Sequence, residues 1–362
     1  MFLVEGGNVR IGEYGADRID ITKIGVSEIR SSLLHVLSDL NALFHKKYGV
    51  FIWDEKTLKA GKIFSGSAFH LMTTKNIKLL KTHKPSFGDI DLQVSDELKE
   101  QVSGFLGTLK YHSTFASYIG CKQSIGQTIT LFTFNFKEKG SINIQIDFEY
   151  VPFKQNEPTE WAKFSHSSSL KDIQAGIKGV FHKYLIRSLT AKEIDDAILF
   201  AIKRKKETFE PKQIKKFAFF ASYGIRQKYK DTGKVKDGKK VYIEDKNTNA
   251  DNYISSIPQL ITLLFGIKEP TKKDADNFFS FVGCVELIKK YIKDHTQLYN
   301  IVMSFANLLW FDKRAQPLYR GDPVRDNMEK TIAFEYLKNE LKVDIPSKFI
   351  EDGKKQYYEN YK

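Results

Sequence analysis

The strongest constraint on the fold is a pair of alternating segments joined by a short polar turn. Residues 128–136 read T-I-T-L-F-T-F-N-F, and residues 142–151 read I-N-I-Q-I-D-F-E-Y-V. Apolar residues that recur with period two are typical of a β-strand with one buried face. The segment between them, residues 137–140, is polar and ends in glycine. We therefore expect an antiparallel hairpin here.

A further strand is predicted upstream, in S-F-G-D-I-D-L-Q-V at residues 86–94. Side chains two residues apart on a strand lie on the same face, so Asp89 and Asp91 would project together while Ile90 and Leu92 pack behind them. Two carboxylates that close repel each other unless a proton or a metal ion lies between them. Taken alone, the segment equally fits a solvent-facing strand that begins with a turn aspartate.

The hairpin supplies another carboxylate. Asp147 alternates with the apolar residues Ile146 and Phe148, as Asp89 does with Ile90. If the two strands are neighbours, Asp89, Asp91 and Asp147 form one cluster, and such hard oxygen ligands are those that Mg²⁺ prefers. Glu149 shares a face with Asp147 and is a fallback third ligand. The sequence thus predicts a magnesium site.

The rest of the chain predicts an α+β protein in two domains, because 362 residues exceed the usual size of a single core. Residues 27–47 read as an amphipathic helix capped by Ser27. Residues 1–155 should form a mixed, mainly antiparallel sheet with flanking helices, and residues 156–362 a helical domain with a basic surface. Helices are expected near residues 212–229, 254–265, 272–293, 296–310, 325–342 and 346–360. Thr190-x-x-Glu193 is a capping box, and residues 231–250 read as an exposed loop or small hairpin.

Charge and composition limit the partners. Lys and Arg number 57 against 44 Asp and Glu, giving a net charge of +13. This surplus favours a polyanion, either nucleic acid or a nucleoside triphosphate, although a solvated basic surface would give the same count. The densest basic run begins at residues 203–206, and the aromatic residues after it fit either single-stranded nucleic acid or a helical core. The two cysteines predict no disulfide framework. With no apolar span, we expect no membrane association and a cytoplasmic location.

A candidate phosphate-binding turn precedes the Asp89 strand. Residues 64–67 read F-S-G-S. Gly66 would permit close approach of the backbone to a phosphate, and Ser67 would offer its hydroxyl and N–H group at a helix start. The alternative interpretation is that Gly66-Ser67 belongs to an ordinary turn.

In order along the chain, these segments resemble the nucleotidyltransferase superfamily of the DNA polymerase β type. That pattern is an apolar residue with Gly-Ser, then Asp-x-Asp in a strand, then a third Asp in a later strand. Ser67 and Asp89 are 89 − 67 = 22 positions apart, longer than is usual in the family, which an insertion would explain. G-G-N-V at residues 6–9, with S-F-G-D-I-D-L, is also similar to nucleotidyltransferase-like proteins of tailed phages.

The resemblance implies roles for the candidate residues. Asp89 and Asp91 would hold two Mg²⁺ ions, and Asp147 would complete the site of the catalytic ion and orient the acceptor hydroxyl. Gly66 and Ser67 would contact the β- and γ-phosphates.

A helix of the second domain would add basic residues to the triphosphate. Lys183 is the first candidate and Arg187, four positions on, the second. A solvated, charged helix face is the alternative for this pair. His166 and His182 have no spacing to carboxylate or cysteine that predicts a catalytic role.

The expected activity is Mg²⁺-dependent transfer of a nucleoside monophosphate from an NTP, ATP or CTP, to a hydroxyl. The basic surplus favours an RNA 3′ end such as that of tRNA as the acceptor. Three alternatives stay open: transfer to a protein or small molecule, synthesis of a nucleotide messenger, and a catalytically inactive nucleic-acid-binding or assembly protein. A phage-encoded protein would act in the host cytoplasm.

Overall fold

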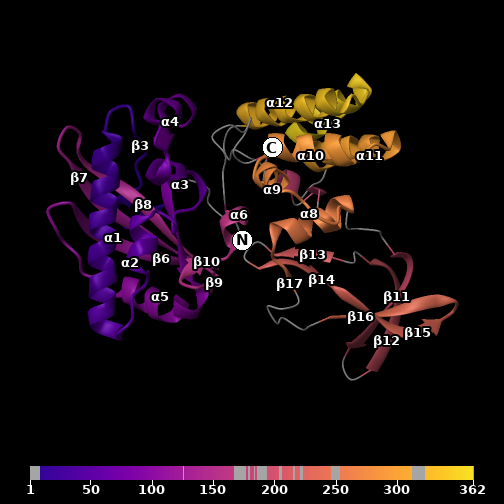
Figure 1. The fold of residues 1–362 in the computed structure, drawn as a ribbon, viewed down its shortest axis with the longest axis horizontal. Coiled ribbons are helices and arrows are strands. Elements are labelled where there is room, and N and C mark those ends of the chain that lie inside the picture. The colour runs from indigo at the N-terminus through magenta and orange to yellow at the C-terminus, as the bar shows by residue number, and fades with distance from the viewer. Residues whose placement is uncertain are drawn as a thin grey trace. The chain divides into compact units, whose positions relative to one another are not determined.

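The computed structural model describes residues 9–124, 126–166, 177, 180–182, 184–185, 194–203, 206–214, 217–220, 223–245, 253–311 and 323–361. The chain divides into two compact units, Met1–Lys171 and Asp172–Lys362 (Figure 1). The division falls later than the expected boundary at residue 155, because helix α6 (Glu160–Ser165) lies in the first unit.

A four-stranded sheet forms the centre of the first unit, in the order β5-β8-β7-β6. Its strands are β5 (Asp89–Ser95), β6 (Ala116–Ser124), β7 (Gln127–Phe136) and β8 (Gly140–Val151). β7 and β8 form the expected antiparallel hairpin, whereas β8 pairs with β5 in parallel. The mixed, mainly antiparallel sheet of an α+β protein is therefore confirmed.

The long helix α1 (Val26–Tyr48) covers one face of this sheet and confirms the helix expected at residues 27–47 (Figure 1). Its N-cap is Gly25, without a side-chain hydrogen bond, so the expected cap at Ser27 is wrong. The helix ends at Gly49, as its sequence pattern indicates. Its apolar stripe shares one core with Ile90 and Phe148, the residues that alternate with the aspartates. Packing of α1 thus leaves the aspartate-bearing face of the sheet on the opposite side.

Shorter elements complete the first unit. The helices are α2 (Glu55–Lys59), α3 (Gly66–Thr73), α4 (Ile77–His83), the 3₁₀ turn Asp96–Leu98 and α5 (Lys99–Gly107). Three two-stranded pairs join β1 (Arg10–Ile11) to β2 (Tyr14–Gly15), β3 (Ile19–Asp20) to β4 (Ser86–Phe87), and β9 (Phe153–Lys154) to β10 (Glu157–Pro158).

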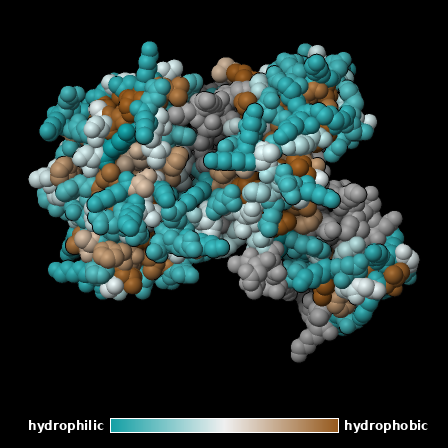
Figure 2. All heavy atoms as spheres, viewed as in Figure 1, coloured by the Kyte–Doolittle hydropathy of each residue, from teal (hydrophilic) through white to brown (hydrophobic). Residues whose placement is uncertain are grey.

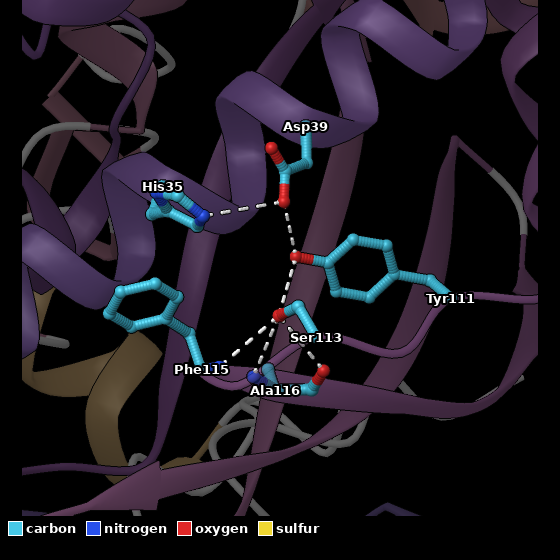
Figure 3. Close-up of polar contacts among 6 residues, drawn as sticks. All are labelled: His35, Asp39, Tyr111, Ser113, Phe115 and Ala116. Carbon is cyan, nitrogen blue, oxygen red and sulfur yellow. Dashed lines mark hydrogen bonds and ion pairs between the residues drawn. The ribbon is translucent and has the colours of Figure 1, made fainter.

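A polar network ties α1 to the turn before β6 (Figure 3). The Tyr111 hydroxyl donates to Asp39 Oδ2 at 2.8 Å and lies 3.0 Å from Ser113 Oγ. Ser113 Oγ in turn accepts the backbone N–H groups of Phe115 and Ala116. Burial raises the pKa of Tyr111 to about 12, so its hydroxyl remains a donor at neutral pH.

The second unit contains two sheets, of which the sequence pattern predicted at most a small hairpin within residues 231–250. One has the order β12-β11-β16-β15 and the other β13-β14-β17. Their strands are β11 (Ile194–Lys203), β12 (Lys206–Ile214), β13 (Phe217–Phe220), β14 (Gly224–Gln227), β15 (Tyr229–Lys236), β16 (Lys239–Glu244) and β17 (Tyr253–Ile254).

The helix expected at residues 212–229 is therefore wrong. Phe217 and Phe220 have helical spacing, but Gly224 adopts φ +122°, a conformation closed to other residues, and starts the strand that pairs back onto β13. A β-carbon on Gly224 would lie 2.4 Å from the Ile254 carbonyl oxygen, so glycine also permits the close approach of β17. Residues 229–244 form the small hairpin that was one reading of the polar segment.

The C-terminal part of this unit is helical, as expected, but two helices, α9 (Lys272–Phe278) and α10 (Phe281–Tyr291), replace the single helix expected at residues 272–293. Its helices are α8 (Ile257–Phe265), α9 (Lys272–Phe278), α10 (Phe281–Tyr291), α11 (His295–Ala306), a π-helical turn at Asn307–Phe311, α12 (Pro323–Leu341) and α13 (Ser347–Tyr361). Among the described residues, no helix combines the length and the apolar character needed to cross a bilayer. The surface drawn in Figure 2 is mostly hydrophilic, with small scattered hydrophobic areas.

Candidate metal and nucleotide site

The parallel pairing of β5 with β8 brings the three predicted aspartates together. Asp91 lies directly opposite Asp147 in the register, and Asp89 opposite Gln145. One carboxylate oxygen from each of Asp89, Asp91 and Asp147 lies within 4.8 Å of the other two. Asp147 is 4% exposed, whereas Asp89 and Asp91 are half-buried. The predicted cluster is thus present, and solvent reaches it at Asp89 and Asp91.

The negative charges of the cluster repel one another. Burial, followed by repulsion from Asp89, raises the pKa of Asp147 to about 7. Burial also raises the pKa of Asp91 well above its usual value, and repulsion from Asp89, then Glu149, adds to this effect. Lys84, which the sequence did not single out, acts on Asp91 in the opposite direction. Such a cluster favours whatever brings positive charge between the oxygens, whether protons or a divalent cation.

Gln145 orients the buried aspartate. Its side-chain Nε2 donates to both carboxylate oxygens of Asp147, at 2.9 and 3.1 Å, and this hydrogen bonding lowers the pKa of Asp147 against the effect of burial. Its Oε1 accepts the backbone N–H of Val9 at 3.3 Å, which fixes the direction of the amide. Period-two alternation places Gln145 on the face of Asp147, so this neighbour could have been found from sequence.

The F-S-G-S turn lies beside the same cluster. Gly66 and Ser67 are the first two residues of α3, and Ser65 is its N-cap residue. The backbone N–H of Ser65 donates to the Asp91 carbonyl at 3.0 Å, and Gly66 adopts φ +53° against the Asp91 carboxylate. Helix α4 occupies part of the long interval between Ser67 and Asp89. The first turn of α3 therefore reaches the aspartates despite that interval.

Glu149, predicted as a fallback ligand, has protein partners instead. Its Oε2 accepts from Ser65 Oγ at 2.9 Å, and its Oε1 lies 3.1 Å from His166 Nδ1. The carbonyl of His166 also accepts the N–H of Gly66 at 2.6 Å. His166 is the C-cap residue of α6, and no spacing in the sequence predicts its contact with a strand residue 17 positions earlier.

Two predicted phosphate contacts, Lys183 and Arg187, lie outside the described residues, as does the capping box at Thr190.

The donor set fits magnesium. Carboxylate oxygens are hard ligands, the three groups converge from adjacent strands, and their mutual repulsion and burial are the costs that a bound divalent cation would offset. The turn at Gly66 adds the first amides of a helix, which favour anions. Together the two features can hold a metal and a phosphate group side by side.

Comparisons with known proteins leave the site as the guide to function: no protein-family model, no curated protein and no solved structure matches this chain.

Proposed function

We propose that this protein is a Mg²⁺-dependent nucleotidyltransferase that moves a nucleoside monophosphate from an NTP to a hydroxyl. The observation that carries the proposal is the convergence of Asp89, Asp91 and Asp147 across β5 and β8, with the turn at Gly66 against Asp91. An acidic cluster alone has many uses. A carboxylate cluster beside the start of a helix offers ligands to a metal ion and amides to a phosphate, which together suit a metal-bound triphosphate.

The side chains have distinct tasks in this proposal. Asp89 and Asp91, on the open edge of the cluster, would hold the cations that a triphosphate brings. Asp147, buried and oriented by Gln145, would complete the metal site and orient the acceptor hydroxyl. The amides that follow Gly66 in the first turn of α3 would face phosphate oxygens, because these groups have no acceptors within the helix, whereas Gly66 N–H already donates to the His166 carbonyl. When bound, Mg²⁺ would neutralise the triphosphate and favour ionisation of the hydroxyl.

The bonding change is a single displacement. The acceptor hydroxyl loses its proton to water and its oxygen forms a bond to the α-phosphorus. The bond from that phosphorus to the bridging oxygen of the β-phosphate breaks, and pyrophosphate leaves with the electron pair of that bond. Asp147 is more buried than Asp89 and Asp91. We therefore assign to Asp147 the orientation of the attacking hydroxyl. Catalysis of this kind depends on positioning and charge neutralisation.

We further propose that the acceptor is RNA, with ATP or CTP as the donor. The hairpin β15–β16 carries Lys234, Lys236 and Lys240 as exposed residues. Lys236 Nζ lies 4.0 Å from the ring centroid of Phe209 on β12, so a cation and an aromatic ring share one face of that sheet. Basic groups interleaved with aromatic rings suit single-stranded nucleic acid, and binding should weaken steeply with salt.

A labelling experiment tests the proposal. Purified protein is incubated with each α-labelled NTP and Mg²⁺, with and without total RNA, beside the Asp89→Asn/Asp91→Asn double variant. Label in RNA with the wild type alone supports the proposed transferase and identifies its base. Label in protein or in a small product supports nucleotidyl transfer but shows that the acceptor is that molecule and not RNA. If the wild type neither transfers label nor binds any NTP in a Mg²⁺-dependent manner, the nucleotidyltransferase proposal is rejected.

A further inference from the structure

We infer that Glu149 is a positioning residue that, together with His166, holds the Ser65–Gly66 turn against the aspartate cluster and so sets the affinity for the triphosphate. The inference rests on the proposed function, because the turn is assigned there to the phosphates. It gives Glu149 a different role from that of a metal ligand, and it gives His166 a role that its sequence position does not predict.

The contacts of Glu149 carry the first step. One carboxylate oxygen accepts from Ser65 Oγ at 2.9 Å and the other lies 3.1 Å from His166 Nδ1. Because a carboxylate oxygen accepts hydrogen bonds, the imidazole donates from Nδ1. The side chains of Glu149 and His166 are 14% and 24% exposed, so water competes little for either bond. Both oxygens are thus engaged by protein groups, and the convergent cluster comprises Asp89, Asp91 and Asp147 without Glu149.

Backbone contacts extend this arrangement to the turn itself. Ser65 N–H donates to the carbonyl of Asp91 at 3.0 Å, and Gly66 N–H donates to the carbonyl of His166 at 2.6 Å. The start of α3 is therefore attached to β5, to β8 through Glu149, and to the end of α6 through His166. Three attachments from separate elements fix both the position and the direction of the first helical turn relative to Asp91.

For triphosphate binding, the position of the turn relative to the aspartates matters more than the stability of the fold. The triphosphate would be held between metal ions at the aspartates and the amides after Gly66, so the distance between these two groups decides whether both can act at once. A displacement of about 1 Å can cost about 100-fold in such an arrangement. Removing the Glu149 side chain leaves the aspartates in place on their strands but removes its contacts with Ser65 and His166, so the turn is held less firmly. Nucleotide affinity should fall while Mg²⁺ affinity persists.

The test compares matched variants by calorimetry. Titration with MgCl₂ alone reports the metal site, and titration with ATP or CTP in saturating Mg²⁺ reports the nucleotide. For Glu149→Ala we expect nucleotide affinity at least 10-fold weaker than wild type and Mg²⁺ affinity within 2-fold. Glu149→Gln should stay within about 3-fold, because its amide oxygen can accept from Ser65 and its amide N–H can donate to the imidazole.

A second pair of variants separates positioning from general damage. Asn can place an amide N–H close to where histidine has Nδ1, so His166→Asn should recover much of the affinity lost in His166→Ala. Ser65→Ala removes only the hydrogen bond from Ser65 Oγ to Glu149. It takes the place of Glu149→Ala in the test if that variant does not fold. Tyr111→Phe is the control, because its hydroxyl bonds to Asp39 and Ser113 and to no residue of the turn, so both affinities should stay unchanged.

Each contrary result has its own meaning. If the wild type binds NTP and Glu149→Ala binds it with equal affinity, the positioning role is overturned and the proposed function is not. Loss of Mg²⁺ binding in Glu149→Ala overturns it in favour of a metal ligand. A wild type that binds no NTP with Mg²⁺, and behaves as Asp89→Asn/Asp91→Asn does, rejects the proposed function and the positioning role with it.

Discussion

The α-carbon of Gly66 lies directly against the carboxylate of Asp91. A β-carbon at residue 66 would stand 2.6 Å from Asp91 Oδ2 and 3.6 Å from its Cγ. The backbone of Gly66 also adopts φ +53°, where residues with side chains are strained. Two independent constraints, the close approach to the Asp91 carboxylate and the left-handed backbone conformation, therefore require glycine where α3 begins.

Replacing Gly66 should damage the site more than the fold. Gly66→Ala must either move the Asp91 carboxylate or shift the start of α3, and the left-handed conformation adds about 1–2 kcal/mol of strain. We expect Mg²⁺-dependent NTP binding to weaken at least 10-fold, as measured by calorimetry. The matched control is Gly104→Ala in α5, where a β-carbon meets nothing within 4 Å. That helical substitution should stabilise by up to about 1 kcal/mol and leave binding unchanged. Equal binding by both variants would contradict the role of Gly66.

Neutralising the buried aspartate should stabilise the metal-free protein. The pKa of Asp147 is raised to about 7, so between about pH 4 and 7 the native state holds a proton that the unfolded chain has lost. The contribution of Asp147 to stability is therefore complete at low pH and is lost as the pH rises through 7. In EDTA at pH 8, Asp147→Asn should raise the free energy of unfolding by about 1–3 kcal/mol, and at pH 4 by much less.

Urea unfolding at both pH values measures this difference. Added Mg²⁺ should stabilise the wild type more than Asp147→Asn, because binding to the native state shifts the unfolding equilibrium and the variant has lost one of the three ligands. A variant that is less stable than the wild type at pH 8 without metal would argue against repulsion within the cluster.

The Tyr111 network should contribute to stability alone. Tyr111→Phe removes the donor to Asp39 from a residue that is 9% exposed, so we expect a loss of about 1 kcal/mol in the free energy of unfolding. Tyr14→Phe is the comparison, because Tyr14 is 46% exposed and its replacement should change stability by less than about 0.5 kcal/mol. Thermal or urea unfolding distinguishes the two. Similar losses for both variants would show that the buried hydroxyl adds nothing specific.

An acid-sensitive group lies in the second unit. Asp274 accepts hydrogen bonds from four groups: Thr271 N–H, Thr271 Oγ1, Lys290 Nζ and Tyr291 OH. Burial raises the pKa of Asp274, but these hydrogen bonds outweigh it and hold the pKa well below its usual value. A depressed pKa means that this contribution is complete above about pH 4 and declines as the pH falls towards the native value.

Asp274→Asn should therefore cost about 2 kcal/mol at pH 7, because hydrogen bonds to a charged group are lost. The difference from wild type should shrink as the pH is lowered from 5 to 2, which urea unfolding across that range would measure. A difference independent of pH would mean that packing, and not charge, makes Asp274 important.

Much of the first unit could be predicted because its signals are local. The alternation in residues 128–136 and 142–151 predicted the hairpin, and the apolar spacing of residues 27–47 predicted α1. The same alternation predicted that Asp89, Asp91 and Asp147 face one side, and the parallel pairing of β5 and β8 makes them neighbours. Helical spacing also predicted the C-terminal helices from α8 onwards.

The remainder depends on contacts between distant parts of the chain. The bond from Ser65 to Glu149 spans 84 positions and the bond from Val9 to Gln145 spans 136, and no local pattern predicts such partners. In residues 212–229, apolar spacing compatible with a helix was overridden by the pairing of β12 with β11, of β13 with β14 and of β14 with β17. Tertiary pairing of this kind decides the structure of segments whose own preference is weak.

The position of β8 in the sheet affects how this protein is made. β8 lies between β5 and β7, yet it leaves the ribosome after both of them. Until residue 151 is synthesised, β5 has no partner in this sheet and Asp89 and Asp91 lack their third carboxylate. A nascent chain that ends earlier would expose the unpaired edges of its strands, a condition that invites chaperone binding or aggregation. Products truncated before residue 151 should therefore lack the proposed activity, because β8, the last strand of this sheet to be synthesised, completes both the sheet and the site.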